Sequence, residues 1–412
     1  MADPRPEEWG SAVDRPDARS GAGGGGPEGR DRTLVMVAGE ASGDQHGARL
    51  VDALRTLDPT LRILGMGGAA MRAAGVRLVA DADETAVVGL TELWEKRRVL
   101  KASLARLQAC LEVERPALVV CIDFPDFNLL LARRARRLGI PVCYFIGPQI
   151  WAWRRGRIRL IRRLIRKMLV LFPFEEPLYR KAGVDVAFVG HPLLDALADV
   201  PSRERCRAAL GLRGTAELIG LLPGSRQAEI SRHLPLLLEA ARRIRAARPE
   251  AEILLGLAAS LDRATVERIV SAAGCPVRLL QGKTHELIRA SDLVLAVSGT
   301  VTLETAILGT PLLITYRLGW LSWLVARLLV RVRFIGLPNL VADRAIAPEL
   351  IQFDATPERL AAEALSLLSD PPRLQVMRDD LAEVRRRLGE RGAAARAARE
   401  VLALLAASGS TR

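Results

Sequence analysis

The feature that most constrains the fold is a repeated alternation of short apolar runs with longer segments of helical spacing. Residues 33–38 are apolar or nearly so, and residues 47–57 then carry apolar side chains at helical intervals. Further apolar runs at 117–122, 218–222 and 293–297 each end in a loop of small or polar residues. Strands that alternate with helices in this way predict an α/β fold, in which parallel sheets are covered by helices on both faces.

The alternation falls into two series, which predict two Rossmann-like domains that join near Pro201. Ahead of the first series lies a stretch rich in Gly and Pro, without the apolar core of a signal peptide. Functional residues in open α/β sheets lie in the loops that follow the carboxyl ends of the strands. The predicted organisation is a disordered extension at 1–32, a first domain at 33–198, a second at 199–375 and C-terminal helices at 376–412.

The chain has 412 residues and a formal net charge of +13, which favours an anionic partner: a phosphorylated substrate, an acidic membrane surface or nucleic acid. An arginine-rich proteome would give the same excess. No apolar run approaches the roughly 18–20 residues of a membrane span. The five cysteines include no C-x-x-C pair and the four histidines form no local metal motif. We therefore expect buried reduced thiols and no metal site.

The loop after residues 33–38 contains Glu40, Ser42, Gly43 and Asp44 and opens a helix. Free backbone N–H groups at a helix start favour anions, and glycine allows a ligand to approach the backbone closely. The alternative is that Ser42 and Asp44 only cap that helix.

A second pair of carboxylates, Asp123 and Asp126, follows the apolar run 117–122 beside two aromatic residues. A partly desolvated carboxylate at the carboxyl end of a strand suits a general base. We expect Asp123 to be the functional residue of the pair. Asp126 is expected to cap the following helix, with Asn128 as the alternative cap.

A strongly basic segment follows the next predicted strand. Trp151 and Trp153 lie in one short loop, and Arg154 and Arg155 begin a stretch, 154–167, that contains no acidic residue. Its apolar side chains recur at helical spacing, which predicts a basic amphipathic helix. We expect the two tryptophans and first two arginines to face an anionic membrane surface; the alternative is a solvated helix face. Residues 316–334 suggest either a second such patch or a helix between subunits.

The second series has a short glycine loop that contains Gly224, Ser225 and Arg226. Arg226 at a helix start suits a diphosphate, because the guanidinium and the backbone N–H groups neutralise the same oxygens.

Small residues also end a later strand of this series, where Ser298, Gly299 and Thr300 leave room for phosphate oxygens. Glu304 lies one turn further on, where its carboxylate suits ribose hydroxyls, although a capping box gives the same pattern. Asn339 is the one polar side chain of the loop 337–340.

Several common mechanisms lack their motifs, since the chain contains neither a P-loop nor a G-x-S-x-G nucleophile elbow. Residues 65–70 fit the weak G-x-G-x-x-A dinucleotide pattern, but not at the first strand-to-helix turn, so a tight turn is expected there. Asp81 and Asp83 form an isolated D-x-D, which is weak support for a metal–diphosphate site.

Taken together, these loops resemble the lipid-A-disaccharide synthases of glycosyltransferase family 19. That family has the GT-B architecture, in which two Rossmann-like domains face an interdomain cleft. Each motif is modest, but the set occurs in the family's order from about residue 33 to residue 404. The motifs are residues 38–44, 88–92, 123–128, 148–153, 172–174, 188–192, 222–226, 298–304 and 337–340.

The resemblance implies an inverting glycosyl transfer in lipid A and lipopolysaccharide biosynthesis, with neither a metal nor another cofactor. UDP-2,3-diacylglucosamine would donate diacylglucosamine to 2,3-diacylglucosamine 1-phosphate (lipid X), giving the lipid A disaccharide 1-phosphate and UDP. The enzyme would be cytoplasmic and peripheral on the cytoplasmic face of the inner membrane, and a homodimer is left open.

The resemblance also implies roles for the loops. Asp123 would be the base, and Arg226 with the helix start at 298–300 would stabilise the leaving diphosphate. Glu304 and Asn339 would hold the UDP moiety, and residues 40–44 would face the acceptor.

Three other functions compete with this interpretation. Two are close: another membrane-surface UDP-sugar transferase of the GT-B class, or a UDP-sugar epimerase. The third is a nucleic-acid-binding protein, suggested by the charge. Because the basic run is one helix with few stacking aromatics and no recognised motif, we predict no nucleic-acid partner.

Overall fold

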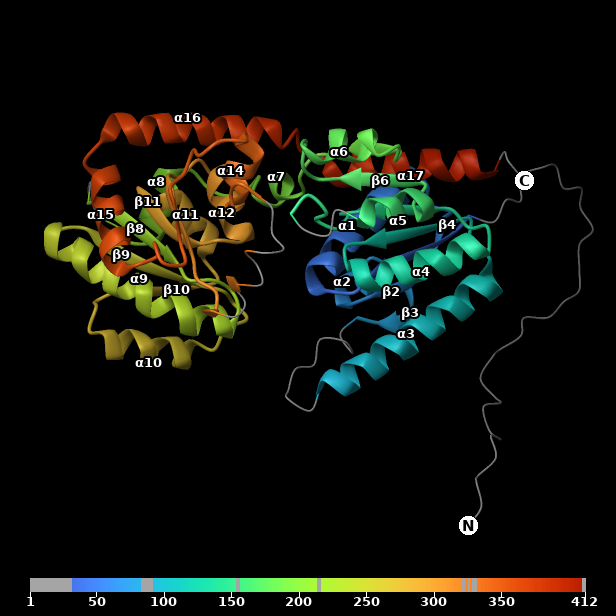
Figure 1. Ribbon diagram of the computed structural model, residues 1–412, viewed down its shortest axis with the longest axis horizontal. Helices are drawn as coiled ribbons and strands as arrows, with labels where there is room; N and C mark the ends of the chain where they lie inside the picture. Colours follow the sequence, from blue (N-terminus) through green and yellow to red (C-terminus); the bar gives the residue numbers. More distant parts are fainter. Residues whose placement is uncertain are drawn as a thin grey trace, which may run out of the picture. The chain divides into compact units, whose positions relative to one another are not determined.

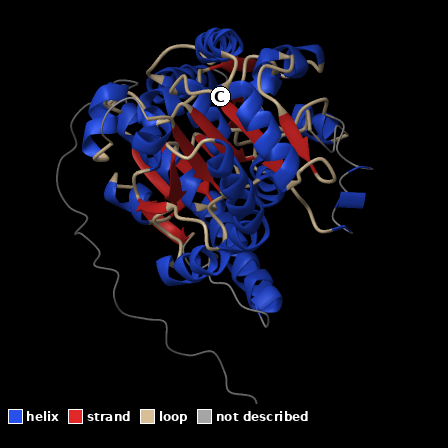
Figure 2. Ribbon diagram, turned by 90° about the vertical axis from the view of Figure 1, so that its left-hand side faces the viewer, coloured by secondary structure: helices blue, strands red, loops and turns tan. Residues whose placement is uncertain are grey.

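The computed structural model describes residues 32–82, 92–152, 156–212, 216–320, 323–324, 327 and 332–409. Its strands form two parallel sheets, and helices cover the faces of both (Figures 1 and 2). The predicted fold class, α/β with two Rossmann-like sheets, is confirmed. Within the described ranges, no helix combines the length and the apolar character needed to cross a membrane.

The first sheet has seven strands in the order β3-β2-β1-β4-β5-β6-β7. Its strands are apolar and mostly buried, as expected for a sheet covered on both faces. They are β1 (Thr33–Ala38), β2 (Arg62–Gly67), β3 (Arg77–Asp81), β4 (Leu118–Ile122), β5 (Val142–Phe145), β6 (Lys167–Val170) and β7 (Val186–Phe188).

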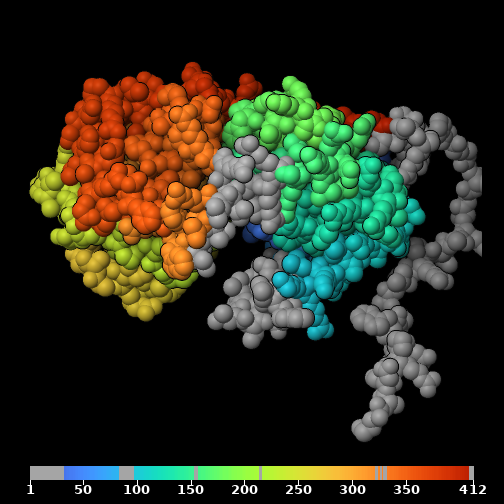
Figure 3. All heavy atoms as spheres, viewed as in Figure 1, coloured from blue at the N-terminus to red at the C-terminus, as the bar shows by residue number. Residues whose placement is uncertain are grey.

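Two groups of helices cover this sheet. One core cluster joins the sheet to α3 (Glu92–Glu114), α4 (Pro125–Arg137), α5 (Arg157–Leu164) and α6 (Glu175–Lys181). In the space-filling view, the cyan to green part of the chain, which contains these helices, forms much of the surface turned to the viewer in this half (Figure 3). The other side is covered by α1 (Ala41–Leu57) and α2 (Ala69–Ala73), with α17 (Ala393–Gly409) packed on α1.

The second sheet has six strands in the order β10-β9-β8-β11-β12-β13. They are β8 (Leu218–Leu222), β9 (Glu252–Leu257), β10 (Arg278–Gln281), β11 (Leu293–Val297), β12 (Leu312–Tyr316) and β13 (Glu349–Ile351). Its helices are α8 (Arg203–Ala209), α9 (Gln227–Ala247), α10 (Arg263–Ala273), α11 (Thr284–Ala290), α12 (Thr300–Ile307), α14 (Leu337–Ala342), α15 (Pro357–Leu368) and α16 (Pro371–Arg387).

Each sheet has one topological switch point, where the direction of strand addition reverses. In the first sheet it lies between β1 and β4, and in the second between β8 and β11. The loops that leave these two pairs of strands diverge to opposite faces of the sheet, which opens a crevice at the carboxyl edge. The predicted site loops follow these strands. In the first sheet they are residues 40–44 after β1 and 123–128 after β4, and in the second sheet 224–226 after β8 and 298–304 after β11.

The C-terminal segment returns to the first sheet. The short helix α7 (Leu193–Ala196) supplies Asp195, whose carboxylate accepts the N–H of Gly392 at 2.7 Å and that of Ala393 at 3.3 Å, at the start of α17. An aspartate at a helix start satisfies N–H groups that have no partner within the helix. The boundaries predicted at 198 and 375 stay predictions, and residues 1–31 lie outside the described residues.

One helix differs clearly from its predicted extent. The spacing of apolar residues in the sequence predicts a helix over about 234–247, whereas α9 begins at Gln227 and continues through Pro235. A proline inside a helix removes one backbone hydrogen bond, so the sequence before it resembled a loop. Packing of the following turns, where Leu236, Leu237 and Leu238 are buried, outweighs that loss.

The close pairing of β1 and β2 requires glycine at position 65, where φ is +152°. A Cβ there would lie 1.7 Å from the carbonyl oxygen of Met36, which is rigid backbone. We expect Gly65→Ala to lower the free energy of unfolding by about 4 kcal/mol or more, measured by denaturant titration.

Gly309→Ala is the matched control, because Gly309 also has positive φ, +73°, but has open space around its Cβ position. Its cost should be only about 1–2 kcal/mol, from backbone strain. Equal losses for the two variants would show that the contact with β1 does not matter.

Candidate functional site

Asp123 lies directly after β4, in a strained turn at the first switch point. Asp123 and Phe124 both have left-handed backbone conformations, with φ of 46° and 50°. Such residues cost on the order of 1–3 kcal/mol each and persist only where their surroundings fix them. Here the Tyr144 hydroxyl and the Asn128 amide each donate to the carbonyl oxygen of Asp123, both at 2.6 Å. The backbone of Asp123 is therefore held by two buried side chains.

The loop after β1 meets this turn. A Cβ on Gly39 would lie 2.1 Å from Cδ1 of Phe124, so the phenyl ring occupies the space that any side chain would need. The same ring stacks on Phe127 with centroids 5.2 Å apart. The glycine after β1 thus serves to admit a side chain from the neighbouring loop.

Burial raises the pKa of Asp123 and is the main cause of the shift. The N–H of Phe124 opposes the shift, whereas the carboxylate of Glu40 adds to it. A carboxylate that holds its proton more tightly than in water is a stronger base when ionised. The half-buried position and the direction of the shift are those expected of a general base.

The capping role predicted for Asp126 is wrong. The N-cap of α4 is Phe124, which makes no side-chain cap hydrogen bond, and Pro125 follows at the first helical position. Asp126 is exposed and pairs with Arg157. The amide of Asn128 is directed to the end of β4, where it also donates to the carbonyl of Ile122 at 3.2 Å, so Asn128 is not the cap either.

Residues 40–44 form the start of α1, and the alternative that Ser42 and Asp44 cap this helix is wrong. Glu40 occupies the N-cap position without a side-chain cap bond, and Ser42 is exposed in the helix. The buried carboxylate of Asp44 accepts the N–H groups of Gly68, Ala70 and Met71 at 2.7, 2.9 and 3.0 Å. Asp44 therefore stabilises the start of α2, a helix other than its own.

Gly43 is also buried, and its Cβ position lies 3.4 Å from the Cβ of Ala38. Only Glu40 and Ser42 of the predicted acceptor-side set are exposed. Residues 65–70 form the end of β2 and the start of α2, the tight turn that was expected.

An aromatic cluster lies at the carboxyl ends of β5 and β6. Trp151 is partly buried, and its ring contacts Phe172 and Phe174 with centroids 6.5 and 5.2 Å away. Its indole N–H donates to the buried carboxylate of Glu175 at 3.2 Å. Trp151 is thus anchored in the protein rather than presented as a free surface ring. Trp153, Arg154 and Arg155 lie outside the described residues.

Glu175 was missed by sequence reasoning, because one glutamate at a helix start resembles an ordinary first-turn acid. It also accepts the N–H of Phe172 at 3.1 Å. Burial raises the pKa of Glu175 to about 7, against the opposing effect of these N–H donors.

Two histidines were also missed, since they are distant in the chain. Burial lowers the pKa of His46 to about 4 and that of His191 to about 3. The electrostatic effect of His46 lowers the pKa of His191 further. His191 packs against Phe172, with ring centroids 5.2 Å apart.

At the second switch point, the loop after β8 is organised by Glu229, another missed residue. Gly224 has φ of +112°, and a Cβ there would lie 2.4 Å from the Glu229 carboxylate. That carboxylate accepts the N–H of Ser225 at 2.9 Å and of Arg226 at 3.3 Å. The two N–H groups expected to face a diphosphate are therefore already bonded. The Arg226 side chain is 79% exposed and lies 3.5 Å from Glu229.

The loop after β11 places Gly299 and Thr300 at an exposed helix start. Ser298 donates its hydroxyl to the carbonyl of Ile335 at 3.0 Å. One turn into α12, Glu304 lies 3.3 Å from Nε2 of His285, and this hydrogen bond raises the pKa of His285. The capping-box alternative is not realised, because Gly299 is the N-cap and no side chain caps α12.

Asn339 is fully buried, and both ends of its amide are used within the protein. Nδ2 donates to the carbonyl of Ala347 and to Glu349, at 2.8 and 2.7 Å. Oδ1 accepts the N–H groups of Ile346 and Ala347. Glu349 in turn accepts the N–H groups of Ile335 and Gly336. Asn339 thus fixes the loop that the Ser298 hydroxyl contacts, and its amide has no bond to spare for a ligand.

Within the described residues, no group of three or more potential ligands is arranged to hold a metal ion. Asp81 forms an ion pair with Arg72, and Asp83 lies outside the described residues. All five cysteines are buried, as predicted.

Solved structures with this arrangement include a UDP-GlcNAc 2-epimerase from Neisseria meningitidis, with a TM-score of 0.56 at 13% identity over 91% of this chain and 100% of that one. A glycosyltransferase from Rickettsia africae has a TM-score of 0.55 at 11% identity over 92% of this chain and 99% of its own. Two Rossmann-like sheets, each with polar loops at its own switch point, define the GT-B class to which this protein belongs.

The family model described as lipid-A-disaccharide synthetase matches residues 34–404. The lipid-A-disaccharide synthase of Syntrophus aciditrophicus is 48% identical to this chain, over 91% of this chain and 98% of the relative. The lipid-A-disaccharide synthase of Myxococcus xanthus is 43% identical, over 90% of this chain and 97% of the relative. The chain belongs to the lipid-A-disaccharide synthase family, and it is a glycosyltransferase of lipid A biosynthesis. The predicted family is confirmed.

The raised pKa of Glu175 predicts a pH dependence of stability. The folded protein holds this proton to about pH 7, whereas the carboxyl of an unfolded chain loses it near 4.5. The contribution of Glu175 therefore falls as the pH rises through that interval and is constant above it. We expect the unfolding free energy of wild type relative to Glu175→Gln to fall by about 2–3 kcal/mol between these pH values, by urea titration.

Glu176→Gln is the control, because it removes a carboxylate from the same turn that pairs with Arg180 at the surface. A similar slope for both variants would mean that Glu175 is not the titrating group.

Proposed function

We propose that the chain transfers diacylglucosamine from UDP-2,3-diacylglucosamine to 2,3-diacylglucosamine 1-phosphate (lipid X) with inversion. The products are the tetraacyl β-1,6-linked disaccharide 1-phosphate and UDP. The single observation that carries the chemistry is Asp123, a half-buried carboxylate with a raised pKa in a rigid turn at a switch point. Membership of the lipid-A-disaccharide synthase family supports the proposal of these two lipid substrates.

In this proposal Asp123 removes the proton from the acceptor hydroxyl as that oxygen attacks the anomeric carbon of the donor sugar. The new glycosidic C–O bond forms while the bond to UDP breaks, and UDP leaves with its electron pair. The transition state has oxocarbenium character, as in glycoside hydrolysis. The neighbouring carboxylate of Glu40 favours proton uptake by Asp123, because it raises the pKa of that group.

The leaving diphosphate develops negative charge, which Arg226 and the start of α12 would stabilise. Arg226 is the exposed cation of its loop, and the first N–H groups of α12 at Gly299 and Thr300 lie at an exposed helix start. A donor of this kind is worth about 3–4 kcal/mol in the transition state. Glu229 now holds Arg226 loosely, so we infer that the diphosphate replaces Glu229 as the partner of the guanidinium.

The remaining assignments follow the same logic. Glu304, one turn from the diphosphate, would accept ribose hydroxyls, with His285 as its neighbour. Asn339 would act by positioning the adjacent loop, because its amide is bonded internally. Gly224, Ser225 and Ser298 lie in the loops after β8 and β11, and Glu40 and Ser42 are the exposed residues proposed for the acceptor side.

Both proposed substrates carry acyl chains, so the enzyme would work at the cytoplasmic face of the inner membrane. Support comes from α5, where Ile161 is buried while Arg159, Arg162 and Arg163 are exposed. Basic side chains near an anionic leaflet contribute about 1 kcal/mol each. The proposed chemistry uses residues of one chain, so a homodimer is not required for it.

The fold alone does not distinguish this transfer from the reaction of a UDP-sugar epimerase, since such an enzyme from Neisseria meningitidis has the same fold. The two activities differ in their need for an acceptor. An epimerase would convert UDP-2,3-diacylglucosamine without lipid X, whereas a transferase releases UDP only when lipid X is present.

We expect the purified chain to produce the disaccharide 1-phosphate and equimolar UDP when given both lipids, and to do so undiminished in the presence of EDTA. The described residues contain no metal-binding cluster, and Arg226 supplies the charge that a metal would otherwise provide. Mass spectrometry of the lipid product and a UDP assay measure this outcome. Turnover of the donor without lipid X would contradict the transferase.

Asp123→Asn should lower kcat by about 10²- to 10⁴-fold, because an amide cannot accept the hydroxyl proton. UDP affinity, measured by calorimetry, should stay within a factor of about two, since Asp123 lies in the first half and the UDP residues in the second. Asp126→Asn, in the same turn but exposed, should retain nearly full activity. Near-normal kcat in Asp123→Asn would remove the base from the mechanism.

A further inference from the structure

A pocket of about 600 Å³ lies at the edge of the first sheet opposite to Asp123. Its walls come from segments that lead into three adjacent parallel strands: residues 139–142 at β5, Arg166 before β6 and residues 183–185 before β7. Because the strands are parallel, their amino ends share one edge, and their carboxyl ends with the catalytic loops lie at the other. This pocket is therefore separate from the proposed active site.

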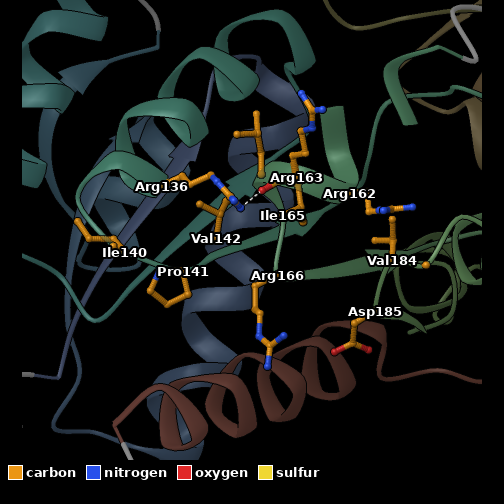
Figure 4. A pocket seen from close by; sticks show the side chains of 13 residues that line it. Arg136, Ile140, Pro141, Val142, Arg162, Arg163, Ile165, Arg166, Val184 and Asp185 are labelled. Atoms are coloured by element: carbon orange, nitrogen blue, oxygen red, sulfur yellow. Dashed lines mark hydrogen bonds between the residues drawn. The ribbon is translucent and has the colours of Figure 1, made fainter. Parts of the chain in front are cut away.

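The lining of the pocket is strongly cationic. It contains Arg136 from α4, Arg162 and Arg163 from the end of α5, and Arg166, against one acid, Asp185 (Figure 4). Asp185 lies 3.8 Å from Lys167, a lysine that also pairs with Glu400 at 2.6 Å. Arg162, Arg163 and Arg166 are exposed, and none of them forms an ion pair within the described part of the chain.

The arginines are attached to a fixed frame. Arg136 donates to the carbonyl of Arg163, which joins the last turn of α4 to the end of α5. The N–H of Arg166 donates to the carbonyl of Val142 at 2.8 Å, so that Arg166 continues the ladder between β5 and β6. Ile165 and Val184 are buried beneath them. Cations gathered on a rigid, partly apolar hollow repel one another until an anion is present.

We propose that this pocket binds a phosphate-bearing ligand. The planar guanidinium forms paired hydrogen bonds with phosphate oxygens, which is why arginine predominates at phosphate sites. A nucleic acid is disfavoured, because no aromatic side chain lines the pocket to stack on a base. The phosphate could belong to the headgroup of an anionic phospholipid or to a soluble phosphoester. The proposal goes beyond the glycosyl transfer, and its lipid-headgroup form rests in part on the proposed membrane location, because Arg162 and Arg163 also belong to the basic face of α5.

The test compares two triple variants that lose the same charge. Arg162→Ala/Arg163→Ala/Arg166→Ala removes the pocket cations. Arg97→Ala/Arg133→Ala/Arg137→Ala is the control, because these arginines lie on α3 and α4, are exposed and do not line the pocket. Circular dichroism and thermal unfolding verify that both remain folded. Binding is measured by calorimetry with glycerol 3-phosphate, and by sedimentation with phosphatidylcholine vesicles that contain or lack phosphatidylglycerol.

We expect at least one phosphate probe to bind the pocket variant about tenfold more weakly than it binds the control variant. A loss confined to vesicles that contain phosphatidylglycerol identifies a lipid headgroup, and a loss with glycerol 3-phosphate identifies a soluble phosphoester; either supports the pocket. Equal losses in the two variants would show that only the overall charge matters. That result, or no binding of either probe to wild type, would overturn the proposal. Because none of the substituted residues belongs to the proposed active site, activity in detergent should be unchanged.

Discussion

Two parallel strand pairs set the positions of the site loops. They are β1 with β4 in the first sheet and β8 with β11 in the second. At each of these two pairs the strand order reverses, so the loops beyond the carboxyl ends separate and leave a crevice. Both pairs consist of apolar residues that are almost completely buried, which fixes their register. The polar residues proposed for catalysis and for UDP binding follow these strands directly, so the core sets where they lie.

Internal hydrogen bonds then hold the loops in place. Tyr144 and Asn128 fix the turn of Asp123, Glu229 fixes the turn of Arg226, and Asn339 with Glu349 fixes the loop beside Ser298. In each case a buried or half-buried side chain bonds backbone groups of the loop, and a buried backbone group left unpaired would cost about 1–3 kcal/mol. Such preorganisation limits the rearrangement required when charge develops in a transition state. The residues that organise the loops therefore matter as much as those that face the substrate.

The two edges of the first sheet have opposite chemical character. The carboxyl edge carries Asp123, whose pKa is raised by burial and, to a smaller extent, by the carboxylate of Glu40. The amino edge carries the pocket arginines near the end of α5. The length of the strands and the packed core separate the pocket arginines from Asp123, so the arginines do not lower the pKa of Asp123. A phosphate ligand at one edge and glycosyl transfer at the other are thus compatible within one domain.

Periodic apolar runs and ordered motifs are local properties of the chain. They were enough to predict the fold class, the family and the loops in which the polar residues lie. The sequence placed Asp123, Arg226 and Ser298 at strand ends without the structure. The hydrogen-bond partners of the polar side chains came from the structure alone. Asp44 caps α2 instead of α1, the amide of Asn339 bonds within the protein, and Glu175 and Glu229 bond groups of neighbouring loops. Those contacts join segments that packing brings together, and spacing along the chain carries no record of them.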